Sequence, residues 1–409
     1  MNSVGNTQLQ SAVDTVAKYG LMEASRYLKV PHSTLSSRLE KARMKGIIAN
    51  GQSLTDEQSL SAENKQHKYK ISNLQKEVDA LKDMLLDQEK VKQFIMELKD
   101  HPVVPPAWTT SASKDKLSSN IPVTIWSDFH WGEVVDPAQV FNVNQYNMKT
   151  ARERLRTVVD KTISLCYDHM VSPSYPGIVL MLGGDMVSGD IHEELEITNE
   201  MPSGPVLIDL LENLIAGIDK FADKFGKVWV IGVAGNHGRT NKKPRFKNRQ
   251  YTNYDWMIYQ LLRNYFKKDD RIKFLIPNGA DAQFSVYDTR FFLTHGDNLG
   301  TNGGDGIIGL LGPVMRGDFK IRNIQGAIGN PYDVMVIGHW HQYMALPKLI
   351  VNGSLKGYDE YANLKLRTRP EPPQQALFFV NRSHGIVCHW PVRCDKVAVK
   401  TKMAADVTL

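Results

Sequence analysis

The sequence is poor in cysteine and has no long uninterrupted apolar segment. Its 409 residues include three cysteines, which form neither an even set nor a C-x-x-C pair: Cys166, Cys388 and Cys394. This excludes the disulfide framework of a small secreted domain, and we expect reduced thiols that serve as small apolar side chains. No segment approaches the roughly 18 apolar residues of a membrane-spanning helix, so no membrane partner is expected.

The N-terminus also lacks a targeting signal. The first residues, MNSVGNTQLQ, contain no basic stretch followed by an apolar one. Together with the cysteine usage, this absence predicts a soluble cytoplasmic protein. Contents of 42% hydrophobic and 23% charged residues are ordinary for a globular protein, while the net charge of +6 indicates an acidic partner.

The most informative stretch runs from Lys227 to Arg249. The apolar residues Val228 to Val233 predict a buried strand, which is followed at once by Asn236 and His237 between small residues. Six basic residues without an acid among them come next: Arg239, Lys242, Lys243, Arg245, Lys247 and Arg249. A site for metal binding or proton transfer therefore adjoins a strip that suits a polyanionic substrate. The alternative for the strip is a solvated loop.

The same layout, a strand that ends in Asp or His, recurs at four other places. The segments are Ser127 to His130 after the strand Val123 to Trp126, Gly183 to Asp185 after Ile178 to Leu182, His295 to Asp297 after Phe291 to Thr294, and Gly338 to His341 after Val334 to Ile337. Ligand sites in open α/β layers lie at the carboxyl ends of strands. We therefore expect all five segments to meet at one edge.

Together the segments supply seven candidate metal ligands: Asp128, His130, Asp185, Asn236, His295, His339 and His341. Such a mixture of carboxylate, amide and imidazole suits Mn²⁺, Fe or Zn²⁺ better than Ca²⁺ or Mg²⁺. Seven ligands are too many for one ion. With one shared carboxylate they suit two ions about 3.5–4 Å apart, which clamp the attacking and leaving oxygens of an in-line phosphoryl displacement.

The ordered motifs D-x-H, G-D, G-N-H, H and G-H-x-H resemble those of the calcineurin-like metallophosphoesterases, over about residues 121–391. The resemblance implies an α/β fold, a four-layer α/β/β/α sandwich of two sheets between helices. It also implies two divalent ions, with Mn²⁺ expected. Carried over by position, Asp128, His130 and His341 hold one ion, Asn236, His295 and His339 hold the other, and Asp185 bridges them.

The resemblance further implies a catalytic role for His237. A hydroxide held between the two ions would attack phosphorus in line, while His237 stabilises the phosphate or protonates the leaving oxygen. Many members of the family place an acid directly after this histidine, where this chain has Gly238. Asp190 and Asp255 are candidates for the orienting group.

Three neighbouring features are interpreted as supporting structure. Asp297 is expected to make hydrogen bonds in its loop rather than to bind metal. His192 is expected to begin a helix, with a contact to substrate as the alternative. The glycine-rich residues 300–309 are expected to give the backbone freedom near the metals.

The rest of this domain alternates strands and helices. Amphipathic helices are predicted from Lys149 to Met170, from Pro205 to Phe225 and from Thr252 to Phe266, with short strands from Ile272 to Thr294 and a terminal hairpin from Phe378 to Cys388.

Residues 1–50 predict a small all-α domain that resembles a helix-turn-helix. One helix ends at Tyr19-Gly20, a second spans Met22 to Leu28, and a third, capped by Ser33, runs through Ala42. The last helix of such a motif docks in the major groove of DNA. The candidate contacts are Ser33, Thr34, Ser37, Arg38 and Lys41. A three-helix interaction module without DNA contact is the alternative.

The domains are joined by polar segments. Residues 51–64 are predicted to be a linker and residues 65–100 a short coiled-coil helix, whose apolar seam from Ile71 to Leu85 pairs two chains or folds back on its own catalytic domain. The catalytic domain could also form the homodimer. Residues 101–120 are predicted to be a second linker, residues 121–395 the catalytic domain and residues 396–409 a tail.

Three functions fit these features. The first is a dinuclear metal-dependent phosphodiester hydrolase that acts as a DNA nuclease, similar to phage-type and DNA-repair-type members of the family; a phage-encoded protein would act in the host cytoplasm. The second is a phosphatase or cyclic-nucleotide phosphodiesterase with the same metals. The third is a DNA-binding regulatory protein with a vestigial metal site. The candidate ligands do not separate the first two functions.

Overall fold

A computed structural model describes residues 5–45, 47, 104–110, 120–171, 173–299 and 311–395. The chain divides into two compact units, Met1–Lys99 and Asp100–Leu409. The predicted linker 51–64, coiled-coil helix 65–100, glycine-rich segment 300–309 and tail 396–409 lie outside the described residues. Within those residues, no helix combines the length and apolar character that a membrane crossing requires.

The described residues of the first unit form two helices around a small apolar core. Helix α1 spans Asn6–Tyr27 and is broken at Gly20, whose φ of 74° and ψ of 164° are not helical; α2 spans His32–Met44. The break lies where the sequence predicted a helix end, because glycine tolerates positive φ. Pro31 occupies the N-cap position of α2 and no side chain caps it, so the expectation that Ser33 caps this helix is wrong.

The second unit begins with a six-stranded sheet in the order β11-β10-β1-β2-β3-β4. The parallel strands are β1 (Asn120–Trp126), β2 (Ile178–Leu182), β3 (Val228–Gly232) and β4 (Ile272–Leu275). The hairpin of β10 (Gln374–Asn381) and β11 (Gly385–Arg393) is antiparallel to β1. Continuous apolar runs form the central strands because both faces of this sheet are covered.

The other sheet has five strands in the order β5-β6-β7-β9-β8. They are β5 (Ala282–Val286), β6 (Thr289–Thr294), β7 (Val334–Ile337), β8 (Met344–Leu346) and β9 (Leu349–Val351). Strands β6, β7 and β9 are parallel, whereas β5 and β8 pair antiparallel at the two edges. The parallel β6 and β7 therefore carry their carboxyl ends to the same edge.

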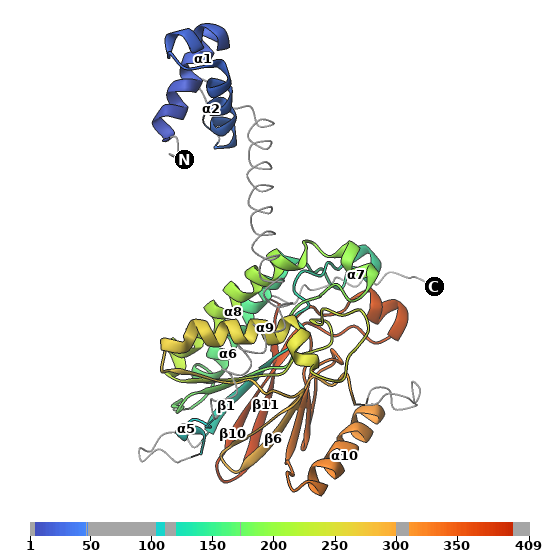
Figure 1. The fold of residues 1–409 in the computed structure, drawn as a ribbon. Coiled ribbons are helices and arrows are strands. Elements are labelled where there is room, and N and C mark those ends of the chain that lie inside the picture. Colours follow the sequence, from blue (N-terminus) through green and yellow to red (C-terminus); the bar gives the residue numbers. More distant parts are fainter. Residues whose placement is uncertain are drawn as a thin grey trace, which may run out of the picture. The chain divides into compact units, whose positions relative to one another are not determined.

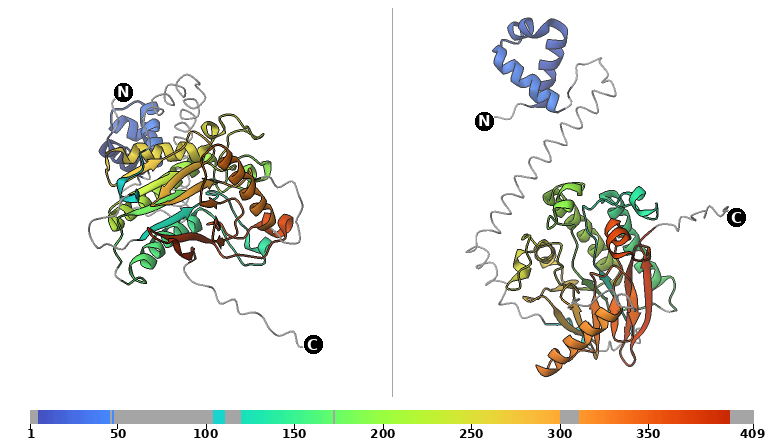
Figure 2. Two further views of the ribbon diagram at one scale, coloured as in Figure 1. Left: turned by 90° about the horizontal axis from the view of Figure 1, so that it is seen from below. Right: turned by 90° about the vertical axis from the view of Figure 1, so that its right-hand side faces the viewer.

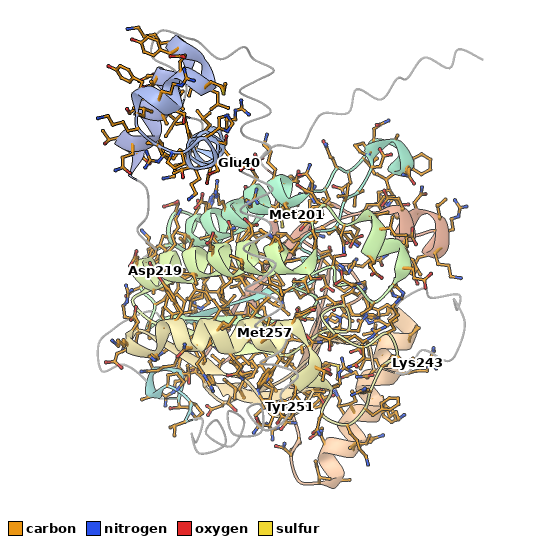
Figure 3. All side chains as sticks on the ribbon, turned by 45° about the horizontal axis from the view of Figure 1, so that its top comes forward. Glu40, Met201, Asp219, Lys243, Tyr251 and Met257 are labelled. Atoms are coloured by element: carbon orange, nitrogen blue, oxygen red, sulfur yellow. The ribbon has the colours of Figure 1, made fainter. Side chains whose placement is uncertain are left out.

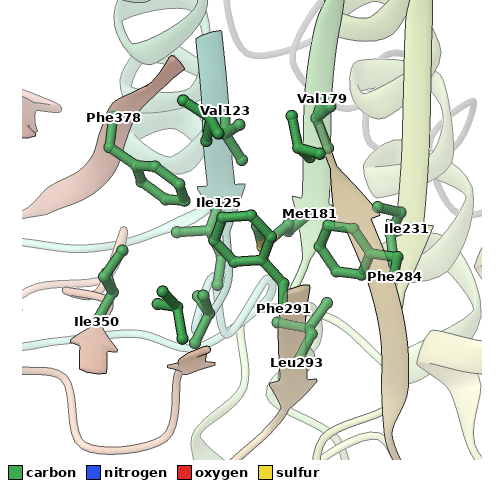
Figure 4. Close-up of a cluster of buried hydrophobic side chains, with 14 of the residues drawn as sticks. Val123, Ile125, Val179, Met181, Ile231, Phe284, Phe291, Leu293, Ile350 and Phe378 are labelled. Carbon is green, nitrogen blue, oxygen red and sulfur yellow. The ribbon is translucent and has the colours of Figure 1, made fainter. Parts of the chain in front are cut away.

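The two sheets pack face to face over an apolar core. Phe291 and Leu293 of β6 lie in this core together with Ile125 of β1 and Met181 of β2 (Figure 4). Phe292, between them in the sequence, belongs to a second cluster on the opposite face of its sheet. This alternation along β6 shows that both faces of the second sheet are also covered.

Helices lie on the outer faces of the sheets. The main helices are α6 (Met148–Tyr167), α8 (Ser203–Phe225), α9 (Tyr254–Tyr265) and α10 (Leu311–Ala327), with the short α7 (Glu193–Thr198). Helices α6, α8 and α9 lie side by side over the first sheet, and α10 lies on the opposite side, against the second (Figures 1 and 2). The predicted mixed α/β architecture with two sheets and helices is confirmed.

Shorter helical turns connect these elements. They are the 3-10 turns η1 (Pro137–Val140), η2 (Arg249–Thr252) and η3 (Phe266–Lys268), and the π-helical turn η4 (Ala362–Leu366).

The predicted linker 101–120 contains a short helix that packs on this unit. Helix α5 spans Ala107–Thr110, and Trp108 packs against the core between the sheets. A Cβ added at Gly177, next to β2, would lie 2.9 Å from the Trp108 ring. The carbonyl of the buried Thr109 accepts a hydrogen bond from the backbone of Tyr287 at 2.7 Å. This part of the segment belongs to the folded unit.

Candidate metal centre

All seven candidate ligands lie in segments that directly follow strands. Those after β1, β2 and β3 lie at the carboxyl edge of the first sheet, and those after β6 and β7 at the corresponding edge of the second. Asp128, His130, Asp185 and His295 are at most 1% exposed, whereas Asn236, His339 and His341 are half-buried. Buried carboxylates need partners or a cation, so this burial indicates a site built around charge.

The backbone is strained at five of these ligands, which have positive φ values although none is glycine: Asp128 (56°), His130 (47°), Asp185 (51°), His339 (66°) and His341 (56°). Such residues are uncommon and cluster at functional sites, where surrounding contacts hold them in place. Here the contacts are mutual. The amides of Asp128 and His130 donate to the carbonyls of Gly184 and Asp185, each at 3.0 Å.

One group of ligands consists of Asp128, His130 and His341. Nε2 of His341 lies 3.3 Å from Oδ1 of Asp128 and 3.1 Å from Nε2 of His130. The three ligand atoms all lie within 4.8 Å of one another, as holding one metal ion requires.

A second group consists of Asp185, His295 and His339, whose ligand atoms likewise lie within 4.8 Å of one another. Nε2 of His295 is 3.0 Å from Oδ2 of Asp185 and 3.1 Å from Oδ1 of Asn236. Oδ2 of Asp185 is also 4.0 Å from Nε2 of His130 in the first group. Asp185 therefore lies between the two groups.

The donor set fits a cation. Nδ1 of His295 donates to the carbonyl of Gly183 at 2.8 Å, and its Nε2 faces two acceptor oxygens, one of Asp185 and one of Asn236. Acceptors converge in this way only around positive charge. Burial lowers the pKa of His295, but the charge of Asp185 and a hydrogen bond to it outweigh burial and raise that pKa to about 10. A divalent ion would supply the same charge as this proton.

A hydrogen-bond network orients Asp128. Oγ of Ser127 donates to Oδ2 of Asp128, and Oδ1 accepts from the amide of His339 at 2.9 Å. Nδ2 of Asn352, which follows β9, donates to Ser127 Oγ at 2.8 Å and to Gln375 at 2.9 Å. Sequence reasoning missed Ser127, Asn352 and Gln375.

Asp255 joins two of the ligand segments from behind. Its carboxylate accepts hydrogen bonds from the amides of Asp185 at 2.9 Å, Met186 at 3.1 Å and Gly235 at 2.9 Å. It is fully buried, and burial followed by the charge of Asp185 raises its pKa to about 7. Asp255 thus fixes the loops after β2 and β3 relative to each other instead of orienting the ring of His237.

His237 lies against both groups. Its amide donates to Oδ1 of Asp185 at 2.7 Å, and its ring centroid lies 4.4 Å from that of His130. Nδ1 donates to the carbonyl of Ser188 at 2.9 Å, so a backbone carbonyl orients this ring and leaves Nε2 to face the site. Nε2 of His237 would also be available to a metal, since His130, Asp185 and His237 form a third group of adjacent ligand atoms.

The glycine after this histidine is explained by its neighbours. A Cβ at Gly238 would lie 2.5 Å from Oδ1 of Asn253 and 3.1 Å from the carboxylate of Asp255. A larger residue, acids included, would collide with Asn253 and make a tight contact with Asp255. Asp190 is not the orienting group either, because Nδ1 of His237 bonds to Ser188 and the carboxylate of Asp190 accepts a hydrogen bond from Ser203.

The basic strip divides into anchoring and exposed residues. Arg239 donates to the carbonyls of Asn236 at 2.9 Å and Asn241 at 3.0 Å, and Arg249 pairs with Asp297 at 3.0 Å. Lys242 lies 3.9 Å from Glu193 and 3.8 Å from Glu196 of α7. The remaining predicted substrate contacts, Lys243, Arg245 and Lys247, are exposed and form no ion pair within the described residues. Figure 3 labels Lys243.

His192 and Asp297 have the places that the sequence predicted. His192 is the N-cap residue of α7, and its ring centroid lies 6.0 Å from that of His237. Asp297 forms its ion pair with Arg249, which supports its role as a loop contact.

The predicted DNA contacts of the first unit all lie on α2. Ser33, Thr34, Ser37 and Lys41 are exposed, and Arg38 is half-buried. Leu35 and Ala42 on the same helix are buried, so α2 has an apolar inner face and a polar outer face.

Comparisons with known proteins give limited information. No family model matches the sequence, and no curated protein does. A candidate 5′-nucleotidase from Staphylococcus aureus is similar in structure at a TM-score of 0.33 and 12% identity, over 69% of this chain and 56% of that one. Phosphopantetheinyl hydrolase from Mycobacterium tuberculosis is similar at a TM-score of 0.26 and 13% identity, over 61% and 94%. Similarities this low assign neither a family nor a substrate.

Proposed function

We propose that this protein is a dinuclear metal-dependent phosphodiester hydrolase that acts on DNA, built on a calcineurin-like α/β/β/α sandwich. The observation that carries the proposal is the position of Asp185. Its carboxylate lies between the group of Asp128, His130 and His341 and the group of His295, His339 and Asn236. A shared carboxylate between two sets of nitrogen and oxygen ligands is the arrangement that holds a pair of ions.

Two bound ions, with Mn²⁺ favoured over Fe or Zn²⁺, would supply Lewis acidity and a nucleophile at neutral pH. The protein supplies the remaining steps. Asp185 and Asp255 keep the loops after β2 and β3 at fixed separation, and Ser188 holds the His237 ring. Nε2 of His237 then contacts the phosphate and delivers a proton to the leaving oxygen.

The basic residues favour DNA over a small phosphate ester. Lys243, Arg245 and Lys247 are exposed on a loop that starts directly after Asn236 and His237. A small phosphomonoester presents too little charge to engage them together, whereas a polynucleotide presents a phosphate at every step. The first unit would add affinity through the outer face of α2, and the predicted coiled coil or the catalytic domain would pair two chains.

In the test, one purified full-length sample with Mn²⁺ is incubated separately with four substrates. They are linear duplex DNA, single-stranded DNA, an aryl phosphodiester and an aryl phosphomonoester. We expect cleavage of DNA and of the diester, abolished by chelation. Hydrolysis of the monoester alone would instead identify a phosphatase, and inactivity on all four with metal bound would favour a vestigial site.

Charge-removing variants test the substrate class. Changing Lys243, Arg245 and Lys247 together to Ser should weaken DNA binding, and the slope of log K against log salt should fall by about 0.7–0.9 for each lost phosphate contact. Hydrolysis of the aryl phosphodiester should stay unchanged. Equal losses on both substrates would show that the loop supports the metal site rather than DNA.

A further inference from the structure

Residues 241–251 form a loop that is closed at its base. The amide of Thr240 donates to the carbonyl of Thr252 at 2.9 Å, and Asn241 Nδ2 donates to Thr252 Oγ1 at 3.2 Å. Arg239 and Asn253 pair as an isolated β-bridge just below. Compact surface loops whose ends lie close together are frequently functional. The closed base lets the exposed middle of the loop project from a fixed position.

Both ends of this loop are attached to ligand segments. At the start, Nη1 of Arg239 donates to the carbonyl of Asn236 at 2.9 Å. At the end, Arg249 makes a two-point ion pair with Asp297, at 3.0 and 3.2 Å, in the segment that follows His295. Asn236 and His295 belong to the same ligand group, so the loop is held beside the metal centre.

An aromatic side chain stands among the cations of the loop. Phe246 is 89% exposed, although a phenylalanine of a folded protein normally covers apolar surface. It lies between Arg245 and Lys247 in the sequence, and all three side chains are exposed. Cations that follow a phosphate backbone, together with an aromatic face on which a base stacks, are the combination with which proteins bind single-stranded nucleic acid.

We infer that this loop binds a single strand of DNA. Phe246 stacks on an unpaired base, and Lys243, Arg245 and Lys247 contact the flanking phosphates. The inference rests on the proposed function and names its substrate class. In a duplex, the faces of the bases are covered by their neighbours except at the ends. The preferred substrate is therefore single-stranded DNA or an unpaired end rather than the interior of a duplex.

The test uses full-length protein with Mn²⁺ and three variants, Phe246→Ala, Phe246→Leu and Phe246→Tyr. Leucine keeps an apolar side chain without a π-face, and tyrosine keeps the ring. Phe319→Ala serves as a matched control, because Phe319 on α10 is 68% exposed. The substrates are an oligothymidine strand, an abasic strand of equal length, a blunt duplex and an aryl phosphodiester. KM is measured for each, with binding by fluorescence anisotropy in the same samples.

The Ala and Leu variants should bind the oligothymidine strand about 5- to 100-fold more weakly, the usual effect of losing one stacked base. The Tyr variant and the Phe319 control should match the wild type. No variant should change binding of the abasic strand or hydrolysis of the aryl phosphodiester.

Two outcomes overturn the inference. In the first, the Ala variant binds oligothymidine as tightly as the wild type does. In the second, the Leu variant keeps full binding, which would indicate apolar contact with a protein partner or with sugars. Failure of the proposed function looks different. In that case the wild type hydrolyses the aryl phosphodiester but cleaves no oligonucleotide, and anisotropy still decides whether Phe246 contacts a base.

Discussion

Oε2 of Glu133 lies 3.2 Å from Nδ1 of His130, on the side of the imidazole away from the other candidate ligands. Oε1 of the same carboxylate accepts from Nζ of Lys356 at 2.9 Å, and Lys356 also pairs with Asp359. All four side chains are at most 9% exposed. A carboxylate behind a ligating histidine fixes the ring and makes its other nitrogen a better ligand. Glu133 would therefore support His130 as a ligand without itself contacting an ion.

Replacing Glu133 with Gln should weaken metal binding. The amide keeps the shape of the side chain but removes the charge that faces Nδ1 of His130. We expect metal affinity to fall about 10- to 100-fold, as for other partners of ligating histidines. Calorimetric titration with Mn²⁺ measures the effect, and Glu212→Gln on the exposed side of α8 is the matched control. Equal affinities of the two variants would contradict the assigned role.

Replacing Lys356 with Met should destabilise the fold. Burial alone would raise the pKa of both carboxylates, but the charge of Lys356 holds the pKa of Glu133 and of Asp359 below the usual range. Removal of the lysine leaves two buried carboxylates without a cation, which costs about 3–5 kcal/mol of unfolding free energy. Urea unfolding measures the loss. Lys273→Met, which removes an exposed pair with Asp270, should cost no more than about 1 kcal/mol.

Metal binding should release a proton from His295. Its pKa is raised from 6.5 to about 10 in the metal-free protein, so the ring is protonated at neutral pH. A metal ion must displace that proton, and affinity should therefore rise with pH until about pH 10. Calorimetry in two buffers of different ionisation enthalpy counts the protons released. The variant His295→Ala should release fewer, and identical heats in the two buffers would disprove the coupling.

Replacing His237 with Ala should lower turnover by about 10²- to 10⁴-fold, the usual contribution of a general acid. Metal content should stay unchanged, because all seven candidate ligands remain. Elemental analysis measures the metal content of the variant, and steady-state kinetics measure its turnover. Loss of metal together with activity would show that His237 is a ligand, as its place beside His130 and Asp185 also allows.

The strand ends were predictable because local signals coincide there. A buried parallel strand is a continuous apolar run, and the polar residue that ends it marks the sheet edge. The sequence therefore placed β1, β2, β3, β6 and β7 within a few residues of their observed ends. The ends of helices were predictable from equally local signals. The apolar period predicted a helix from Lys149 to Met170, and α6 spans Met148–Tyr167.

The supporting network could not be predicted in the same way. Asp255 lies in the first turn of α9 and binds the loops after β2 and β3, so its role follows only from the pairing of those strands. Asn352 and Gln375 reach Ser127 from distant parts of the sequence. Glu133 had a usable signal, an acid three residues after a candidate ligand. The need for glycine at position 238 is explained only by the structure, in which Asn253 and Asp255 occupy the space beside it.

Truncation before α5 and truncation after α5 should affect the stability of the second unit differently. Removal of residues 1–99 deletes the first unit and leaves every candidate ligand and α5, so the remainder should fold and hydrolyse an aryl phosphodiester at an unchanged rate while its affinity for duplex DNA falls. Removal of residues 1–110 also deletes Trp108, which packs on the core between the sheets, and Thr109, which accepts from Tyr287. Trp108 is half-buried, so its loss should cost less than the about 3–5 kcal/mol of a fully buried tryptophan, and this longer truncation should unfold at lower temperature. The point variant Trp108→Ala in the full chain separates packing from chain length. Equal melting temperatures for the two truncations would show that α5 does not support the domain, and unchanged duplex affinity in the shorter one would favour an interaction module over a DNA-binding one.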